Sequence, residues 1–167
     1  ATIYLPLILS IDGSHVIRWW VDTSFGVHPD MKSHTGAMMS MGTGAAQSSS
    51  GKQKINASSS TEGELIGASD KLSQCIWTKN FLEAQGYSID DNVMYQDNQS
   101  AMLLENHGKA SSSKRTRHIS LRYYWITDRI QNGELRVAYC PTDDMKGDYF
   151  TKPLQGKKFR TFRNDIQ

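Results

Sequence analysis

Four acidic residues stand where they could share one site, although they come from four different expected elements of the chain: Asp22, Glu64, Asp97 and Asp148. Carboxylates that lie close together raise each other's pKa, and a divalent cation removes this conflict. Two Mg²⁺ ions about 3.5–4 Å apart can activate a water molecule and stabilise the leaving oxygen during phosphodiester cleavage. Hard oxygen ligands without a Cys/His cluster favour Mg²⁺ or Mn²⁺ over Zn²⁺. The four acids are therefore candidates for a metal site that hydrolyses phosphodiesters.

Each acid also has a purely structural interpretation. Asp22 could begin a turn with the hydroxyl residues that follow it. Asp97 is a natural N-cap for a following helix, and Asp148 could be a solvated surface charge. Spacing alone leaves both interpretations open for each residue.

The segment SSSTEGEL at 58–65 contains the capping-box pattern twice, as Ser59 with Glu62 and as Thr61 with Glu64. In a capping box, the side chains satisfy unpaired N–H groups in the first turn of a helix. One helix needs only one such box. We expect Ser59 and Glu62 to close the helix, which leaves Glu64, about half a turn further on, to face the other acids.

The elements that must position these acids begin with strands. VIRWWVD at 16–22 is rich in β-branched and aromatic residues, which predicts a strand that ends at Asp22. Further strands are expected at 37–41 and near 45–48, joined by a Gly-Thr-Gly turn at 42–44. These segments predict an antiparallel, three-stranded start to the sheet.

Helices and strands alternate in the rest of the chain. Apolar residues recur at helical spacing from Leu65 to Ile76, which predicts a long helix that runs to about Gln85 and stops at Gly86. A strand is expected at 92–96, followed by a helix that Asp97 can cap and a polar linker at 108–117. The remaining elements are a helix marked by Ile119 to Ile130, a strand at 135–139, and a helical region that opens at Pro141, breaks at Pro153 and resumes near Gly156. The order βββ-α-β-α-α-β-α implies an α/β fold, with a mixed five-stranded sheet flanked by helices. In such sheets, polar groups at the carboxyl ends of strands converge in one crevice.

Charge is distributed unevenly along the chain, whose formal net charge is +2. Residues 1–105 contain six Lys/Arg and eleven Asp/Glu, a net charge of −5, whereas residues 106–167 contain thirteen and six, a net charge of +7. The densest basic stretch consists of Lys114, Arg115 and Arg117, at the approach to an expected helix. We expect these three residues to contact phosphates. The alternative is that Lys and Arg simply solubilise the C-terminal half.

Several functional classes are not supported by the sequence. Cys75 and Cys140 lack CxxC spacing and paired histidines, so neither a zinc site nor a disulfide framework is predicted. Both are most simply core thiols of an intracellular protein. Apolar runs such as LPLIL at 5–9 are far shorter than the 18 or more residues of a membrane span, so we expect no membrane partner.

Five motifs, in this order and spacing, resemble the ribonuclease H domain at the end of copia-type LTR-retrotransposon polyproteins. They read WWVDTSFGVHPDMKSHTGAMMSMG, SSSTEGEL, YQDNQSAMLLEN, KRTRHISLRYY and VAYCPTDDMKGDYFTKPL. The resemblance covers about residues 16–155. Residues 1–15 look like the end of the connection from an upstream reverse transcriptase, and residues 156–167 resemble the extension that follows TKPL in these polyproteins.

The resemblance implies a ribonuclease H-like fold and an endonuclease that cleaves the RNA strand of RNA–DNA hybrids. It maps the family's four-acid site, with two Mg²⁺ or Mn²⁺ ions, onto Asp22, Glu64, Asp97 and Asp148. One departure concerns Lys146 and Gly147, because the family usually has a small or apolar residue and an alanine before this aspartate. The lysine could weaken cation binding, or it could point outward and hold a phosphate.

The same resemblance implies an RNA–DNA hybrid as substrate and a reverse transcriptase domain upstream in the same polyprotein as partner. It also implies an intracellular, cytoplasmic location within virus-like particles. A non-catalytic ribonuclease H-like module that binds nucleic acid or braces the polymerase is the alternative, although its signature would be lost acids and all four are present. An integrase or transposase is disfavoured because such enzymes typically take their glutamate from a late helix, whereas Glu64 lies on the first helix.

Polar side chains beside the acids are candidates for recognising the hybrid. An A-like duplex is read by its shape, and 2′-hydroxyl contacts distinguish RNA from DNA. Four residues next to Glu64 and Asp97 can contact a 2′-hydroxyl or serve only as helix caps: Ser60, Thr61, Asn98 and Gln99. His118, expected as the first helical residue, could meet a phosphate, assist product release, or make only a structural hydrogen bond.

Overall fold

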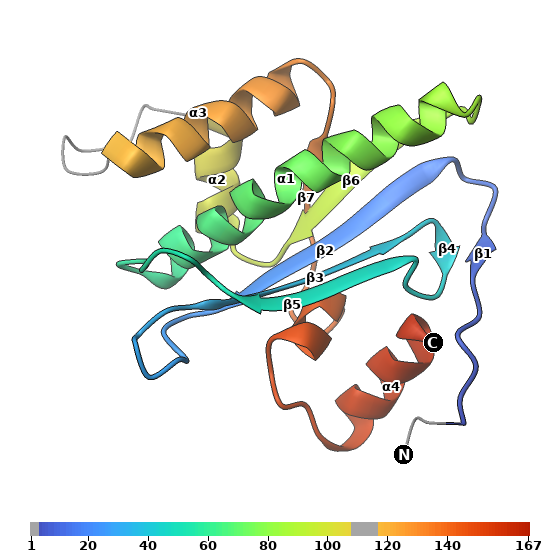
Figure 1. Ribbon diagram of the computed structural model, residues 1–167, viewed down its shortest axis with the longest axis horizontal. Helices are drawn as coiled ribbons and strands as arrows, with labels where there is room; N and C mark the ends of the chain where they lie inside the picture. The colour runs from blue at the N-terminus through green and yellow to red at the C-terminus, as the bar shows by residue number, and fades with distance from the viewer. Residues whose placement is uncertain (1–3, 108–116) are drawn as a thin grey trace.

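A five-stranded mixed sheet lies at the centre of the structure, a computed structural model that describes residues 4–107 and 117–167 (Figure 1). Across the sheet the strands are β5 (Gln47–Lys52), β3 (His34–Ser40), β2 (Val16–Ser24), β6 (Asp91–Gln96) and β7 (Arg136–Tyr139). β3 is antiparallel to both β2 and β5, whereas β6 runs parallel to β2 and to β7. The predicted α/β fold with a mixed sheet is confirmed.

Helices cover both faces of this sheet (Figure 1). On one face lie α1 (Ser60–Ala84), α2 (Gln99–His107) and α3 (Arg117–Gln131). On the other face lie the 3₁₀ helix η2 (Lys146–Phe150) and α4 (Gly156–Ile166). None of the helices in the described segments has the length and apolarity that crossing a membrane would take.

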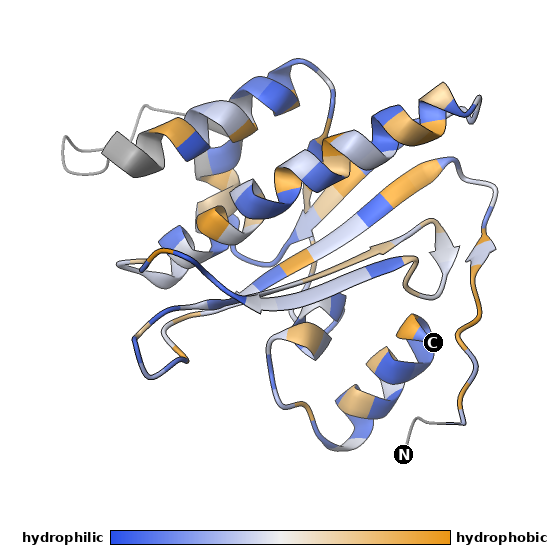
Figure 2. Cartoon of the chain, viewed as in Figure 1, coloured by the Kyte–Doolittle hydropathy of each residue, from blue (hydrophilic) through white to orange (hydrophobic). Residues whose placement is uncertain are grey.

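The central strand β2 carries apolar side chains on both faces. Ile17 and Trp19 belong to the core that includes Leu72 of α1, whereas Trp20 belongs to a second core that includes Phe162 of α4. A strand covered on both faces has a continuous apolar run rather than an alternating pattern. Figure 2 shows orange, apolar segments along both β2 and β6, which on β2 alternate with white and blue ones.

The second and third strands differ in extent from the prediction. The strand expected at 37–41 begins earlier, as β3 at His34, and the strand expected near 45–48 extends further, as β5 to Lys52. The sequence of β5, QSSSGK, contains no β-branched or aromatic residue, and most of its side chains are exposed. β5 is a strand because its backbone pairs with β3 at the edge of the sheet, which residue type alone does not reveal.

The Gly-Thr-Gly stretch that was expected as a turn forms a short strand instead. β4 (Gly42–Thr43) pairs antiparallel with β1 (Ser10–Ile11) in a separate two-stranded sheet. A Cβ on Gly42 would lie 2.4 Å from the carbonyl oxygen of Ser10. Glycine is therefore needed here for the close approach of two backbones, and not only for a turn.

The segment 156–167, expected as an extension, packs against the rest of the chain as α4. Phe162 and Ile166 are buried in the core that contains Trp20. The backbone N–H of Ala45 donates to the carbonyl of Ile166 at 2.9 Å, which ties the end of the helix to the segment before β5. The side chains of α4 therefore complete the second face of the sheet.

Candidate active site

Three of the four predicted acids converge at one end of the sheet. One carboxylate oxygen from each of Asp22, Glu64 and Asp97 lies within 4.8 Å of the others. Asp22 is near the carboxyl end of β2, and Asp97 directly follows the parallel neighbouring strand β6. α1 passes over this end of β2 and supplies Glu64 from its first turns. Parallel strands thus bring residues 75 positions apart to the same edge, as the topology predicted.

The start of α1 assigns different tasks to the two glutamates. The Ser59 hydroxyl oxygen caps the helix by accepting from the Glu62 N–H at 3.2 Å. The Glu62 carboxylate accepts from the Ser58 N–H at 2.8 Å and from the Ser58 hydroxyl. A standard capping box would use the N–H of the cap residue itself, so here the bond is shifted by one residue. The predicted cap by Ser59 is confirmed, the Glu62 carboxylate bonds Ser58 instead of Ser59, and Glu64 takes no part in the cap.

Glu64 is a buried carboxyl group that is only half satisfied. Its Oε1 accepts from the Thr23 N–H at 3.2 Å, whereas its buried Oε2 has no hydrogen-bond partner among the described residues. Burial, followed by the charges of Asp22 and Asp97, raises the pKa of Glu64 well above its usual range. α1 can lie this close to the sheet because Gly67 faces Thr23, where a Cβ would come within 2.6 Å of the hydroxyl oxygen.

Asp22 is almost completely buried, with 1% of its surface exposed. Burial raises its pKa, while a hydrogen bond from the Thr151 hydroxyl and the charge of Lys152 lower it. The Lys152 ammonium lies 3.5 Å from Asp22 Oδ1. The negative charge of Asp22 is therefore offset by a residue that is 130 positions away in the chain.

Asp97 does not cap α2, so the predicted capping role is wrong by one residue. Asn98 is the cap, because its Oδ1 accepts from the Ala101 N–H at 3.1 Å and α2 begins at Gln99. The carboxylate of Asp97 is left to accept from the Thr142 hydroxyl at 3.1 Å and to face the other acids. At the start of α2, Asn98 caps the helix and Asp97 faces the acids, just as Glu62 belongs to the helix start of α1 and Glu64 faces the acids.

Asp148 lies apart from the compact group of three acids. Its Oδ1 pairs with Lys152, and its Oδ2 lies 2.9 Å from the ammonium of Lys158. Its negative charge still contributes to the raised pKa of Asp22, and Lys152 contacts both carboxylates. Asp148 therefore borders the site, with both of its oxygens bound to lysines.

The two unusual residues before Asp148 have separate structural explanations. Lys146 points away from the acids, because its ammonium lies 3.3 Å from Asp165 and 4.9 Å from the centre of the Trp20 ring. Gly147 is needed for space, since a Cβ there would lie 2.8 Å from the Cβ of Asp22. Lys146 was expected either to weaken cation binding or to point outward. The structure shows that it points outward and pairs with Asp165.

The group of three acids fits a divalent cation. Burial and neighbouring negative charges raise the pKa of Asp22 and of Glu64, so a positive charge would stabilise their ionised forms. The free Oε2 of Glu64 points to an additional ligand. All candidate ligands are oxygen atoms, which favours Mg²⁺ or Mn²⁺. Asp22, Glu64 and Asp97 could hold such an ion, whereas Asp148 would first have to release a lysine.

The predicted substrate-binding residues lie around this site to different degrees. Ser60 and Thr61 are in the first turn of α1, Asn98 caps α2, and Gln99 is exposed at its start. The other four predicted residues belong to the basic stretch and the histidine after it. Lys114 and Arg115 lie outside the described residues, and so do the side chains of Arg117 and His118. Their contacts with phosphate stay predictions.

Two lysines and a threonine of the site were not singled out in the sequence. Thr151 and Lys152 belong to the TKPL motif, so a signal was present, but nothing local indicated which acids they would meet. Lys158 lies in the segment that was expected to be an extension. Only the packing of α4 brings its ammonium to Asp148.

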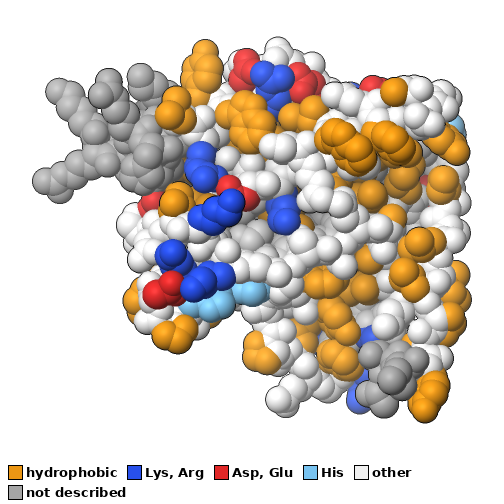
Figure 3. Space-filling view, in the orientation of Figure 1, with side chains coloured by type: hydrophobic (Ala, Val, Ile, Leu, Met, Phe, Trp, Pro, Cys, Tyr) orange, Lys and Arg blue, Asp and Glu red, His pale blue; other side chains and the backbone are white. Residues whose placement is uncertain are grey.

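A further polar group lies beside the site on β3 and β5. Figure 3 shows histidine side chains gathered with basic and acidic ones on this side of the molecule. Lys52 pairs with Asp30 at 3.0 Å, and the Nε2 of His34 lies 2.8 Å from the Ser50 hydroxyl. Ser50 in turn donates to the carbonyl of Phe150 at 2.6 Å, directly before the segment that carries Lys152.

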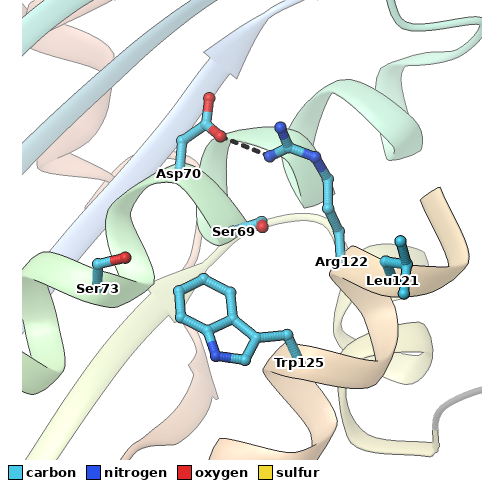
Figure 4. A pocket seen from close by; sticks show the side chains of 6 residues that line it. All are labelled: Ser69, Asp70, Ser73, Leu121, Arg122 and Trp125. Atoms are coloured by element: carbon cyan, nitrogen blue, oxygen red, sulfur yellow. Dashed lines mark hydrogen bonds and ion pairs between the residues drawn. The ribbon is translucent and has the colours of Figure 1, made fainter. Parts of the chain in front are cut away.

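An open pocket between α1 and α3 is separate from the acids (Figure 4). An ion pair between Asp70 and Arg122 bridges the two helices at its edge, and the indole of Trp125 forms one wall. Its lining residues are Ser69, Asp70, Ser73, Leu121, Arg122 and Trp125. None of the four predicted acids is among them.

Relatives of known origin match most of the chain. It is 35% identical over 145 residues, 86% of its length, to "Retrovirus-related Pol polyprotein from transposon TNT 1-94" of Nicotiana tabacum. It is 33% identical over 159 residues, 95% of its length, to "Retrovirus-related Pol polyprotein from transposon RE2" of Arabidopsis thaliana. The chain spans 11% and 10% of the lengths of these two curated relatives. No protein-family model matches the chain.

Solved structures with a similar fold include LC11-RNase H1 in complex with an RNA/DNA hybrid, with a TM-score of 0.51 and 10% identity. That match covers 77% of this chain and 88% of the other. The structure of LC11-RNase H1 isolated from compost by a metagenomic approach gives a TM-score of 0.50 and 12% identity, covering 77% and 86%. At such low identity the likeness concerns the fold alone.

Proposed function

The chain belongs to the copia-type transposon Pol polyproteins, as a segment with the ribonuclease H fold, and on this premise we propose that it is a metal-dependent endonuclease that hydrolyses the RNA strand of RNA–DNA hybrids. Both the family and the fold agree with the resemblance of its five motifs. The proposal extends them to a reaction and a substrate for this chain. It places that reaction beside a reverse transcriptase in the same polyprotein, in the cytoplasm within virus-like particles.

The observation that carries the proposal is the convergence of Asp22, Glu64 and Asp97. Three acids from separate elements meet within 4.8 Å, and two of them are buried. Such a group destabilises the fold through like-charge repulsion and desolvation unless a cation binds. A structural role alone does not explain why Glu64 Oε2 is buried without a partner.

Mg²⁺ or Mn²⁺, as two ions in the complete site, would supply an activated water and stabilise the leaving oxygen. The chain's own residues hold the carboxylates in place. Thr23 orients Glu64 through its backbone N–H, Thr142 orients Asp97, and Thr151 orients Asp22. Asp148 is the fourth ligand in this proposal, after it releases Lys152.

Recognition of the hybrid is proposed to use residues on both sides of the acids. Ser60 and Thr61 at the start of α1 and Gln99 at the start of α2 are accessible enough to contact a 2′-hydroxyl. The basic stretch around Arg115 would contact phosphates and thereby position the duplex. His118 is proposed to meet a phosphate or assist product release.

A cleavage assay with a labelled RNA–DNA hybrid and Mg²⁺ tests the proposed function. Asp97→Asn changes one oxygen ligand with almost no change in size, and we expect it to abolish RNA cleavage. Asp70→Asn is the matched control, because Asp70 is exposed, pairs with Arg122 of α3 and does not belong to the group of acids. We expect this control to retain cleavage.

The comparison should use both this chain and a longer chain that includes the upstream polymerase region. Cleavage that survives Asp97→Asn would show that the acids are not the active site. Absence of cleavage from wild type in both chains would instead favour the alternative, a non-catalytic module that binds nucleic acid or braces the polymerase.

A further inference from the structure

The ammonium group of Lys152 lies among the acids of the candidate site. It pairs with Oδ1 of Asp148 and lies 3.5 Å from Oδ1 of Asp22. Both carboxylates are almost fully buried, whereas the Lys152 side chain is 37% exposed. One positive charge is thus shared between two buried negative charges.

The backbone around Lys152 is held so that this ammonium must fall close to the acids. The hydroxyl of Thr151 donates to Asp22, and the Ser24 hydroxyl donates to the Thr151 carbonyl at 3.2 Å. One residue earlier, the Phe150 carbonyl accepts from Ser50. The Lys152 N–H itself donates to the Asp148 carbonyl at 2.9 Å. Bonds to β2, β5 and η2 therefore hold the segment, so that displacement of the ammonium would require movement of the lysine side chain and not of the backbone.

Lys158 holds the second oxygen of Asp148 from the other side. Its ammonium lies 2.9 Å from Asp148 Oδ2 and also donates to the Thr142 carbonyl at 2.9 Å. α4, which carries Lys158, is anchored by Phe162 in the core. Asp148 therefore pairs with two lysines, Lys152 and Lys158. Lys152 also contacts Asp22, which belongs to the group of three acids.

A divalent cation held by both Asp22 and Asp148 would need carboxylate oxygens that Lys152 now contacts. We propose that Lys152 is a built-in counter-cation, which pairs with Asp22 and Asp148 in the metal-free protein and competes with the divalent ion that would join these two carboxylates. The inference rests on the proposed metal-dependent function. An ion held by Asp22, Glu64 and Asp97 meets the lysine only at Asp22, whereas an ion that needs Asp148 must displace it from the carboxylate with which it pairs.

Calorimetric titration of the hybrid-free protein with Mn²⁺ tests this competition. In Lys152→Met the weaker Mn²⁺ should bind at least about tenfold more tightly than in wild type, equivalent to about 1.4 kcal/mol. In chelator the same variant should melt at a lower temperature, because two buried carboxylates lose their counter-charge. Lys152→Arg should restore wild-type behaviour, since it keeps the charge.

Lys146→Met is the matched control, because Lys146 is close in sequence but pairs with Asp165 and faces away from the acids. It should leave the Mn²⁺ isotherm unchanged. Equal isotherms for wild type and Lys152→Met would overturn the competition and leave the proposed function intact. Absence of Mn²⁺ binding from every protein would overturn both.

A measurement on the wild type covers the case in which Lys152→Met does not fold. The Lys152 ammonium protons should be protected from solvent exchange in chelator, as seen by nitrogen-detected NMR, and should lose protection when Mg²⁺ saturates the site. Protection that Mg²⁺ does not change would contradict the displacement of the lysine.

Discussion

Replacement of Glu64 by glutamine should raise the stability of the metal-free protein while abolishing hydrolysis. Glu64 is 5% exposed, its Oε2 is unpartnered, and its ionised form is disfavoured by burial and by the charges of Asp22 and Asp97. Glutamine has the same size, keeps an acceptor for the Thr23 N–H, and offers an amide that can donate to the neighbouring carboxylates. Relief of one unsatisfied buried polar group is worth about 1–3 kcal/mol. For a chain of this length, that corresponds to a rise in Tm of roughly 2–10 °C.

The pH dependence of this effect has a definite sign. The pKa of Glu64 is raised in the folded state above the ordinary value of 4.5. The unfolded state therefore releases its proton first, and folding becomes less favourable as pH rises through 4.5 towards the folded pKa. The advantage of Glu64→Gln over wild type in chelator should be absent at low pH, grow above 4.5, and reach its full size beyond the folded pKa.

Glu62→Gln is the matched control, two residues earlier on the same helix. Glu62 accepts from the N–H and the hydroxyl of Ser58, so its replacement should lower stability by about 0.5–2 kcal/mol and retain cleavage. Thermal unfolding followed by circular dichroism, with and without Mg²⁺, measures both variants. A metal-free Glu64→Gln protein that melts below wild type, or that still cleaves the hybrid, would refute this account of the site.

Three other predictions concern spacing, charge and a second buried acid. Gly147→Ala should lower the free energy of unfolding, measured in urea, by about 1–3 kcal/mol and impair cleavage, because the new Cβ would press on Asp22. The control is Gly51→Ala, which has open space around it and should change the free energy of unfolding by less than about 0.5 kcal/mol. Simultaneous replacement of Lys114, Arg115 and Arg117 by alanine should raise the Kd for a hybrid by on the order of tenfold at moderate salt and make the Kd less dependent on salt. A filter-binding assay measures both effects, and unchanged binding would show that this stretch does not contact the hybrid. Burial raises the pKa of Glu105 from 4.5 to about 8, so the stability of the wild type should fall as pH rises between these values. Glu105→Gln should flatten this dependence in thermal melts recorded across the pH range. If the variant has the same pH dependence as the wild type, the dependence comes from other groups.

Local patterns were sufficient for those parts of the fold that depend on neighbouring residues. The apolar run of β2 and the apolar spacing of α1 predicted both elements, and the Ser59 cap follows from hydrogen bonds that span three residues. The order of strands and helices then predicted the mixed sheet. β5 was placed less accurately because QSSSGK has no apolar pattern, and its pairing with β3 defines it.

The convergence of Asp22, Glu64 and Asp97 was expected from topology, since parallel strands end at one edge of a sheet. The residue expected to cap α2 was wrong by one position, because both Asp97 and Asn98 are residue types that can cap a helix. Only the path of the backbone decides which of the two side chains accepts a hydrogen bond from the first turn.

The sequence by itself therefore determined most of the elements, their order and the acids that could share a site. The tertiary structure decided which charges meet. Asp22 and Lys152 lie 130 positions apart, and Lys158 reaches Asp148 only because α4 packs its apolar face beneath the sheet. Periodicity carries information over one or two helical turns, whereas the partners of a buried charge depend on distances of a few ångströms between distant segments.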